Sequence, residues 1–186
     1  MPNKLISTHR ASFLTTEPAG SHCRIRHREK CEALRLLTSQ LVLALQRVRP
    51  GGTVVILLHR LDSWRSVALL HRFAAFARIR LFKPRHGHTM RTSFYLVAQN
   101  VQPRCAAAQR AVGAWKEQWK AATFGGDGGG DEAPDTASGD MVNSVLEDFG
   151  SRLIRMAAPV FAIQAEALRN APFMKGNAGE ETAGIM

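Results

Sequence analysis

The chain has 186 residues, an apolar fraction of 45%, a formal net charge of +10 at pH 7 and an isoelectric point near 10.5. This length allows one domain, or one domain with a tail, and the apolar fraction is ordinary for a globular core. The charge is uneven, because residues 1–104 hold 18 Lys and Arg against 4 Asp and Glu, whereas residues 105–186 hold 7 against 11. The basic first part is therefore the candidate nucleic-acid surface.

The cysteines and the lengths of the apolar runs indicate which cellular compartment to expect. Cys23, Cys31 and Cys105 are odd in number and lack the spacing of a disulfide framework, which favours a reducing environment. No apolar run approaches the roughly 18 residues of a membrane span, and no secretory signal stands out. We expect an intracellular protein, cytoplasmic or nuclear, with a mitochondrial presequence in residues 1–20 as the alternative.

The first regular element follows an irregular, basic N-terminus. Residues 1–26 show no sustained periodicity and are expected to be poorly ordered. From His27 to Val48, apolar residues recur at steps of three and four and predict an amphipathic helix packed on a sheet. Its apolar stripe consists of Cys31, Leu34, Leu37, Leu41, Leu45 and Val48, widened by Leu36 and Leu43.

A turn and an unbroken apolar run follow this helix. Pro50 disfavours continuing the helix, and Gly51 and Gly52 permit a sharp reversal. The run from Thr53 to His59 is rich in large and β-branched apolar residues without alternation. Such a run predicts a parallel strand that is covered on both faces.

The next segments predict a helix and two more strands. Asp62 or Ser63 can cap a helix over residues 64–77. Residues 78–82 alternate basic and apolar side chains, as a half-exposed strand does, and residues 93–98 form a more buried strand. Residues 85–92 between them are too many for a tight turn and too basic for a core, so they predict a loop at the rim.

The remaining chain predicts a helical tail. A helix over residues 103–123 is followed by a flexible Gly- and Asp-rich linker over residues 124–139. Two further helices are expected at 140–156 and 159–171, within a helical tail that spans 140–174. Residues 175–186 are expected to be disordered.

The order helix, turn, strand, helix, strand, loop, strand is typical of the last third of a doubly wound α/β sheet. Three strands with one covering pair of helices would leave a sheet edge and an apolar face open. We therefore interpret residues 27–102 as a partial domain, and we expect a partner chain or a missing half to cover that edge.

Several short motifs within residues 30–101 carry a family resemblance. They are Gln40-Leu41 with Ala44-Leu45, Pro50-Gly51-Gly52-Thr53, Phe73 with Phe76, Lys83-Pro84, and Ser93-Phe94-Tyr95-Leu96-Val97-Ala98. In this order and spacing they resemble the C-terminal part of the FtsJ-like family of RNA ribose 2′-O-methyltransferases, and the tail is similar to extensions of fungal relatives. The resemblance implies a Rossmann-like sheet, S-adenosylmethionine as methyl donor, and a structured RNA such as ribosomal RNA as acceptor.

The resemblance also implies where catalytic groups would stand. Family members use a Lys-Asp-Lys-Glu set, and the last two positions correspond to Leu57 and Ser93 in this chain. Leucine can neither orient nor acidify a ribose hydroxyl, so no catalytic residue is assigned. The glycine-rich turn that binds the donor is also missing, since Gly125 to Gly130 follow a helix rather than a strand.

These departures predict an incomplete methyltransferase-type domain that is inactive alone and does not bind S-adenosylmethionine. The alternative is a non-catalytic RNA-binding or partner-binding module derived from the same fold. The candidate RNA-binding residues are Arg78, Arg80, Lys83, Arg85, His86, His88 and Arg91. A solvated basic rim with no ligand is the plainer interpretation of the same residues.

Other chemistry-bearing residues have structural interpretations that we prefer. His22, Cys23, His27 and Cys31 invite a zinc site, but no Cys-x-x-Cys pair supports one, so no metal is expected. The wide apolar side of the first helix suits a sheet better than a membrane. Trp64, Trp115 and Trp119 are assigned to helix packing rather than base stacking, Tyr95 to the sheet, and His59 to the end of its strand.

Overall fold

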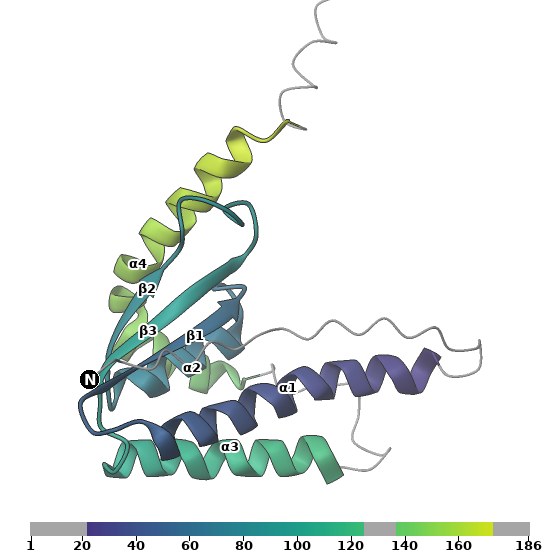
Figure 1. Ribbon diagram of the computed structural model, residues 1–186, viewed down its shortest axis with the longest axis vertical. Coiled ribbons are helices and arrows are strands. Elements are labelled where there is room, and N and C mark those ends of the chain that lie inside the picture. Colours follow the sequence, from purple (N-terminus) through teal and green to yellow (C-terminus); the bar gives the residue numbers. More distant parts are fainter. Residues whose placement is uncertain (1–21, 125–136, 173–186) are drawn as a thin grey trace, which may run out of the picture.

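The computed structural model describes residues 22–124 and 137–172, with side chains described from residue 32 onward. Within these residues the fold is mixed α/β, with one three-stranded antiparallel sheet and four helices (Figure 1). The elements in chain order are α1 (His22–Arg47), β1 (Gly52–His59), α2 (Trp64–Ala74), β2 (Arg78–Phe82), β3 (Ser93–Val101), α3 (Ala106–Phe124) and α4 (Gly139–Arg169).

The sheet has the order β1-β3-β2, and β3 is antiparallel to both neighbours. β1 and β2 therefore run in the same direction and are joined by α2, while β3 returns between them. The prediction that β1 pairs in parallel with its neighbour is wrong, because β2 and β3 are joined by a loop, which brings β3 back antiparallel. Both strand pairs are therefore antiparallel, although β1 and β2 point the same way on either side of β3.

The predicted turn between α1 and β1 depends on both glycines. Gly51 has a φ of +78°, a left-handed conformation that favours glycine, and its N–H donates to the carbonyl of Val101 at 2.9 Å. A Cβ on Gly52 would lie 2.7 Å from Val48 Cγ2 and 2.8 Å from the carbonyl oxygen of Arg49. The turn thus connects the end of α1 to the start of β1 in a space that a larger residue would overfill.

The core lies on one face of the sheet. Phe73 of α2 is fully buried, with its ring centroid 4.9 Å from that of Phe76 and 5.7 Å from that of Trp115 on α3. Phe94 and Leu96 of β3 are also fully buried and belong to the same apolar cluster. The helix-packing role predicted for Trp115 is confirmed.

The helix α1 differs from its prediction in two respects. It begins at His22, so residues 22–26 belong to a helix rather than to the irregular N-terminus. Leu34, Leu41 and Leu45 are buried as predicted, but Leu36 and Leu43 are exposed. The buried stripe is therefore narrower, because α1 packs along one side against α3 instead of lying flat on the sheet (Figure 1).

The other boundaries follow the predictions closely. Ser63, and not Asp62, caps α2, since its side-chain oxygen accepts a hydrogen bond from the N–H of Ser66. α2 ends at Ala74, three residues early, and β3 extends three residues further than expected, to Val101. The predicted linker lies largely outside the described residues, as does the predicted C-terminal end.

The two tail helices predicted at 140–156 and 159–171 are one continuous helix, α4, with Pro159 inside it. Proline removes one helical hydrogen bond and normally ends or kinks a helix. Here Pro159 is exposed, so the carbonyl left without a partner can meet water, while Ala157 and Val160 on either side are buried in the core. Packing of this apolar stripe outweighs the local preference to stop.

Candidate nucleic-acid interface

Side chains alternate between the two faces of the sheet, and only one face is covered. The helices α2 and α4 lie behind the strands in Figure 1, and the buried residues Leu58, Ile79 and Leu96 face them. The opposite face, here named the open face, consists of Val55, Leu57 and His59 of β1, Arg78, Arg80 and Phe82 of β2, and Ser93, Tyr95, Val97 and Gln99 of β3. Among the described residues no helix packs on it, so the prediction that β1 is covered on both faces is wrong: α2 and α4 cover only the other face, and Leu57 stays exposed.

Strand register arranges the open face in cross-strand rows. One row joins Leu57, Tyr95 and Phe82, and the next joins Val55, Val97 and Arg80. The Tyr95 and Phe82 ring centroids are 6.2 Å apart with planes inclined by 41°. Leu57 is 38% exposed and Phe82 is 55% exposed, so the first row is an accessible apolar and aromatic strip.

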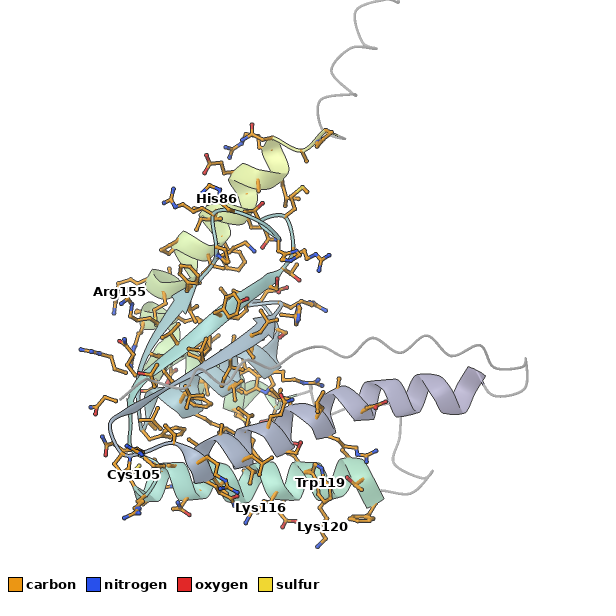
Figure 2. The ribbon with its side chains drawn as sticks, in the orientation of Figure 1. His86, Cys105, Lys116, Trp119, Lys120 and Arg155 are labelled. Atoms are coloured by element: carbon orange, nitrogen blue, oxygen red, sulfur yellow. The ribbon has the colours of Figure 1, made fainter. Side chains whose placement is uncertain are left out.

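Basic side chains surround this strip. Arg78 and Arg80 are exposed on β2, and the loop between β2 and β3 carries exposed Arg85, His86, His88 and Arg91. Figure 2 shows His86 at the far end of this loop, beyond the ends of the strands. Neither the segment 52–59 nor the segment 78–101 contains an Asp or Glu. The structure thus places Arg78 and Arg80 on the open face and His88 and Arg91 at the pocket beside it, while Arg85 and His86 are exposed in the same loop.

Lys83 is the exception among the predicted residues. It is only 3% exposed, and its Nζ donates to the carbonyl oxygens of Arg91 at 2.6 Å and Ser93 at 2.9 Å. Because β2 alternates, the position after exposed Phe82 points away from the open face. A direct phosphate contact by Lys83 is therefore ruled out by its burial, and its role is to fasten both ends of the loop.

A small pocket lies where this loop meets the strands. Its volume is about 210 Å³, and it is lined by Leu57, His59, Ser93 and Tyr95 of the sheet and by Pro84, His88 and Arg91 of the loop. The backbone is left-handed at Gly87 and His88, with φ of +68° and +53°, which folds the loop back toward the sheet. The N–H of Arg60 donates to the carbonyl of Thr92 at 3.2 Å and ties the end of β1 to the loop.

The pocket contains both positions at which the resembled family carries catalytic groups, Leu57 and Ser93. Sequence reasoning placed them in different strands, and the register of β1 against β3 brings both strands to the same end of the open face. His59 ends β1 as predicted, and it also lines the pocket, where it adds an imidazole. The pocket therefore offers polar groups at its rim and leucine at the lysine position.

A second groove of about 450 Å³ lies at the opposite end of β1. The cations that line it are Arg47, Arg49, Arg104 and Lys116, from the end of α1, the turn, the segment before α3 and the middle of α3. Sequence reasoning missed this groove because its cations are spread over 70 positions of the chain. Phe82 was also missed, although the alternation of β2 places it on the face of Arg78 and Arg80.

Neither cavity fits S-adenosylmethionine. The pocket at Leu57 is smaller than the roughly 300–1,000 Å³ of typical cofactor sites. The larger groove gathers four cations, which would repel the sulfonium and ammonium groups of the donor.

Comparisons with known proteins found no match among protein-family models, curated proteins or solved structures. Within the described residues, no helix is both long and apolar enough to cross a membrane. The same residues hold no cluster of three or more His, Cys, Asp or Glu that would suit a metal ion. The side chains of His22, Cys23, His27 and Cys31, to which the zinc interpretation refers, lie outside the described set.

The free energy of unfolding is expected to rise with pH because of Lys83. Burial removes water from its ammonium group and lowers its pKa below the usual 10.5. Between the lowered folded value and 10.5, the unfolded chain holds more protons than the folded chain, so stability increases with pH across this window. Urea unfolding of the wild type and of Lys83→Met at a series of pH values up to about 10.5 measures how the free energy of unfolding changes with pH in each protein. Equal pH slopes in the two proteins would refute the prediction.

Proposed function

We propose that this chain is a non-catalytic RNA-binding module built on the C-terminal part of an FtsJ-like methyltransferase-type sheet. The observation that carries the proposal is the open face, an uncovered sheet surface that carries Arg78 and Arg80 and adjoins a basic loop, without a carboxylate on its strands or loop. Uncompensated cations on one surface are the electrostatic signature of a phosphate-binding protein. The acceptor expected from the resemblance, a structured RNA such as ribosomal RNA, is the first RNA to test.

The topology supports the relation to a methyltransferase-type sheet. β1 and β2 run in the same direction around a connecting helix, as in a doubly wound sheet, and β1 pairs only with β3 within the described residues. The free edge of β1 is where further strands of a complete sheet would continue. Leu57 and Ser93 also line one pocket, as two positions of a single family site should.

The same pocket argues against methyl transfer by this chain. Transfer to a ribose needs a group that acidifies the hydroxyl or stabilises the developing alkoxide. Leu57 has no such group, and its neighbours in the row, Tyr95 and Phe82, add no cation there. His88 and Arg91 line the pocket, and their N–H groups could donate hydrogen bonds to a phosphate or a base edge, which needs no catalytic group.

RNA binding is expected to weaken steeply with salt. If about four phosphates are contacted, the dissociation constant should rise roughly 50-fold between about 50 and 200 mM salt. Filter binding of a labelled ribosomal RNA fragment at both concentrations measures this. Absent or salt-independent binding would remove the RNA-binding proposal.

Calorimetry with S-adenosylmethionine is expected to show no heat of binding, and micromolar affinity would contradict the non-catalytic assignment.

A further inference from the structure

We propose that the open face is a stacking platform for single-stranded RNA, on which bases stack against Tyr95 and Phe82 while Arg78, Arg80 and Arg91 neutralise the adjacent phosphates. This inference rests on the proposed RNA-binding function and specifies its ligand. It assigns a base-stacking role to Tyr95, for which the sequence favours a place in the sheet over a base contact, and to Phe82, which the sequence did not single out.

The aromatic pair lies outside the core cluster. Phe82 is 55% exposed and lies on the face opposite the core, and Tyr95 beside it on the central strand is only half-buried. An exposed aromatic residue on an uncovered sheet loses apolar burial that the core face would have provided. Ring faces held at neighbouring positions of a rigid sheet are the arrangement on which RNA bases stack.

The dimensions of the sheet suit a nucleotide strand. Neighbouring strands are about 4.8 Å apart, so the row from Leu57 through Tyr95 to Phe82 forms an apolar strip about 10 Å wide. Arg80 lies two residues along β2 from Phe82, a distance of about 7 Å, and Arg78 lies about 14 Å away. A base on the aromatic strip therefore has cations within side-chain reach of its flanking phosphates.

The adjoining pocket adds polar groups at one end of the strip. Tyr95 is shared between the strip and the pocket, and His59, Ser93 and Arg91 also line the pocket. A base at the end of the strip can meet these hydrogen-bonding groups with its edge. In a duplex the base faces are already stacked, so the platform should favour single strands.

A protein layer is the competing occupant of an open sheet face. Such a layer would bury Arg78 and Arg80 against a surface that would have to supply matching carboxylates, since burying unpaired cations is costly. A phosphate backbone neutralises these cations and leaves them partly hydrated. The arginines alternating with aromatic and apolar groups therefore favour RNA over a packed protein layer.

The test compares aromatic and aliphatic side chains at the same positions. Fluorescence anisotropy with a labelled ten-nucleotide single-stranded RNA and a matched duplex measures the affinity of the wild type, Tyr95→Phe, and the double variant Tyr95→Leu with Phe82→Leu. We expect Tyr95→Phe to bind the single strand as the wild type does, and the double leucine variant to bind it at least about tenfold more weakly. Affinity for the duplex should change little in either variant.

Phe124→Leu is the matched control, because Phe124 is an exposed aromatic residue at the end of α3, away from the open face. It should leave single-strand affinity unchanged, and thermal unfolding should confirm that all variants fold. Single-strand binding that survives in the double leucine variant would overturn the platform and leave the RNA-binding function standing. Failure of the wild type to bind any RNA would overturn both. Dimers that disappear on reversing the charge of Arg78 and Arg80 would show that a second copy covers the face, which also overturns the platform.

Discussion

Replacing Phe73 by alanine is expected to lower the free energy of unfolding by about 3–5 kcal/mol. Phe73 is fully buried and its ring lies between Phe76 and Trp115, so it joins α2 to α3. The truncation removes apolar burial and leaves a cavity that the rigid sheet cannot fill by relaxing. Urea unfolding followed by tryptophan fluorescence measures the loss, because Trp115 reports on the same cluster.

Phe161→Ala is the control for this change, since Phe161 of α4 is exposed. Its effect should stay within about 0.5 kcal/mol, as for other surface substitutions. If both variants lose the same stability, the core cluster around Phe73 is not what holds α2 and α3 together. A large loss of stability in Phe73→Ala alone would show that the cluster on the covered face of the sheet is the centre of the core.

Local patterns predicted most elements, and long-range packing decided the rest. The strand at 78–82 is predictable because Arg and apolar residues alternate along it. The turn at Gly51 is predictable because glycine tolerates a positive φ. The run from Thr53 to His59 predicts a parallel strand covered on both faces, and both features are wrong. The direction of its neighbour depends on β3, which lies more than 30 residues further along the chain, and the coverage depends on where the helices pack.

Proline and leucine illustrate the same limit at single residues. The sequence predicts two helices with a break before Pro159, yet α4 continues through this residue because Ala157 and Val160 are both buried in the core. Leu36 and Leu43 have the right spacing to widen the stripe of α1, but the surface available to α1 is narrower than that stripe. A periodic pattern predicts which face of a helix can be buried. The surface on which the helix packs decides how many residues of that face are buried.

The candidate site was predictable in its charge and not in its shape. Arg78 and Arg80 could be assigned because they share one face of a strand. The burial of Lys83 could not, because its partners are two backbone carbonyls, those of Arg91 and Ser93, brought close by the loop. The aromatic row likewise exists only through the register that places Phe82 beside Tyr95.

Reversing two charges on the open face, with Arg78→Glu and Arg80→Glu, is expected to weaken RNA binding at least tenfold at about 50 mM salt. Two phosphate contacts are lost, and the new carboxylates repel the backbone at the same positions. The slope of log affinity against log salt should fall in magnitude by about 1.4, because each single-strand phosphate contributes about 0.7. Filter binding across a salt series gives the affinity and the slope together.

The matched control is Arg110→Glu with Lys120→Glu on α3, both exposed and away from the open face; Figure 2 shows Lys120 on the outer side of that helix. Each double variant lowers the formal net charge from +10 to +6, so general attraction to RNA is reduced equally. If the phosphate site is local, only the variant with Arg78→Glu and Arg80→Glu should show a large loss of RNA affinity and a smaller salt slope. Equal losses would mean that RNA responds to the total charge of the chain, and the open face would then have no special part in binding.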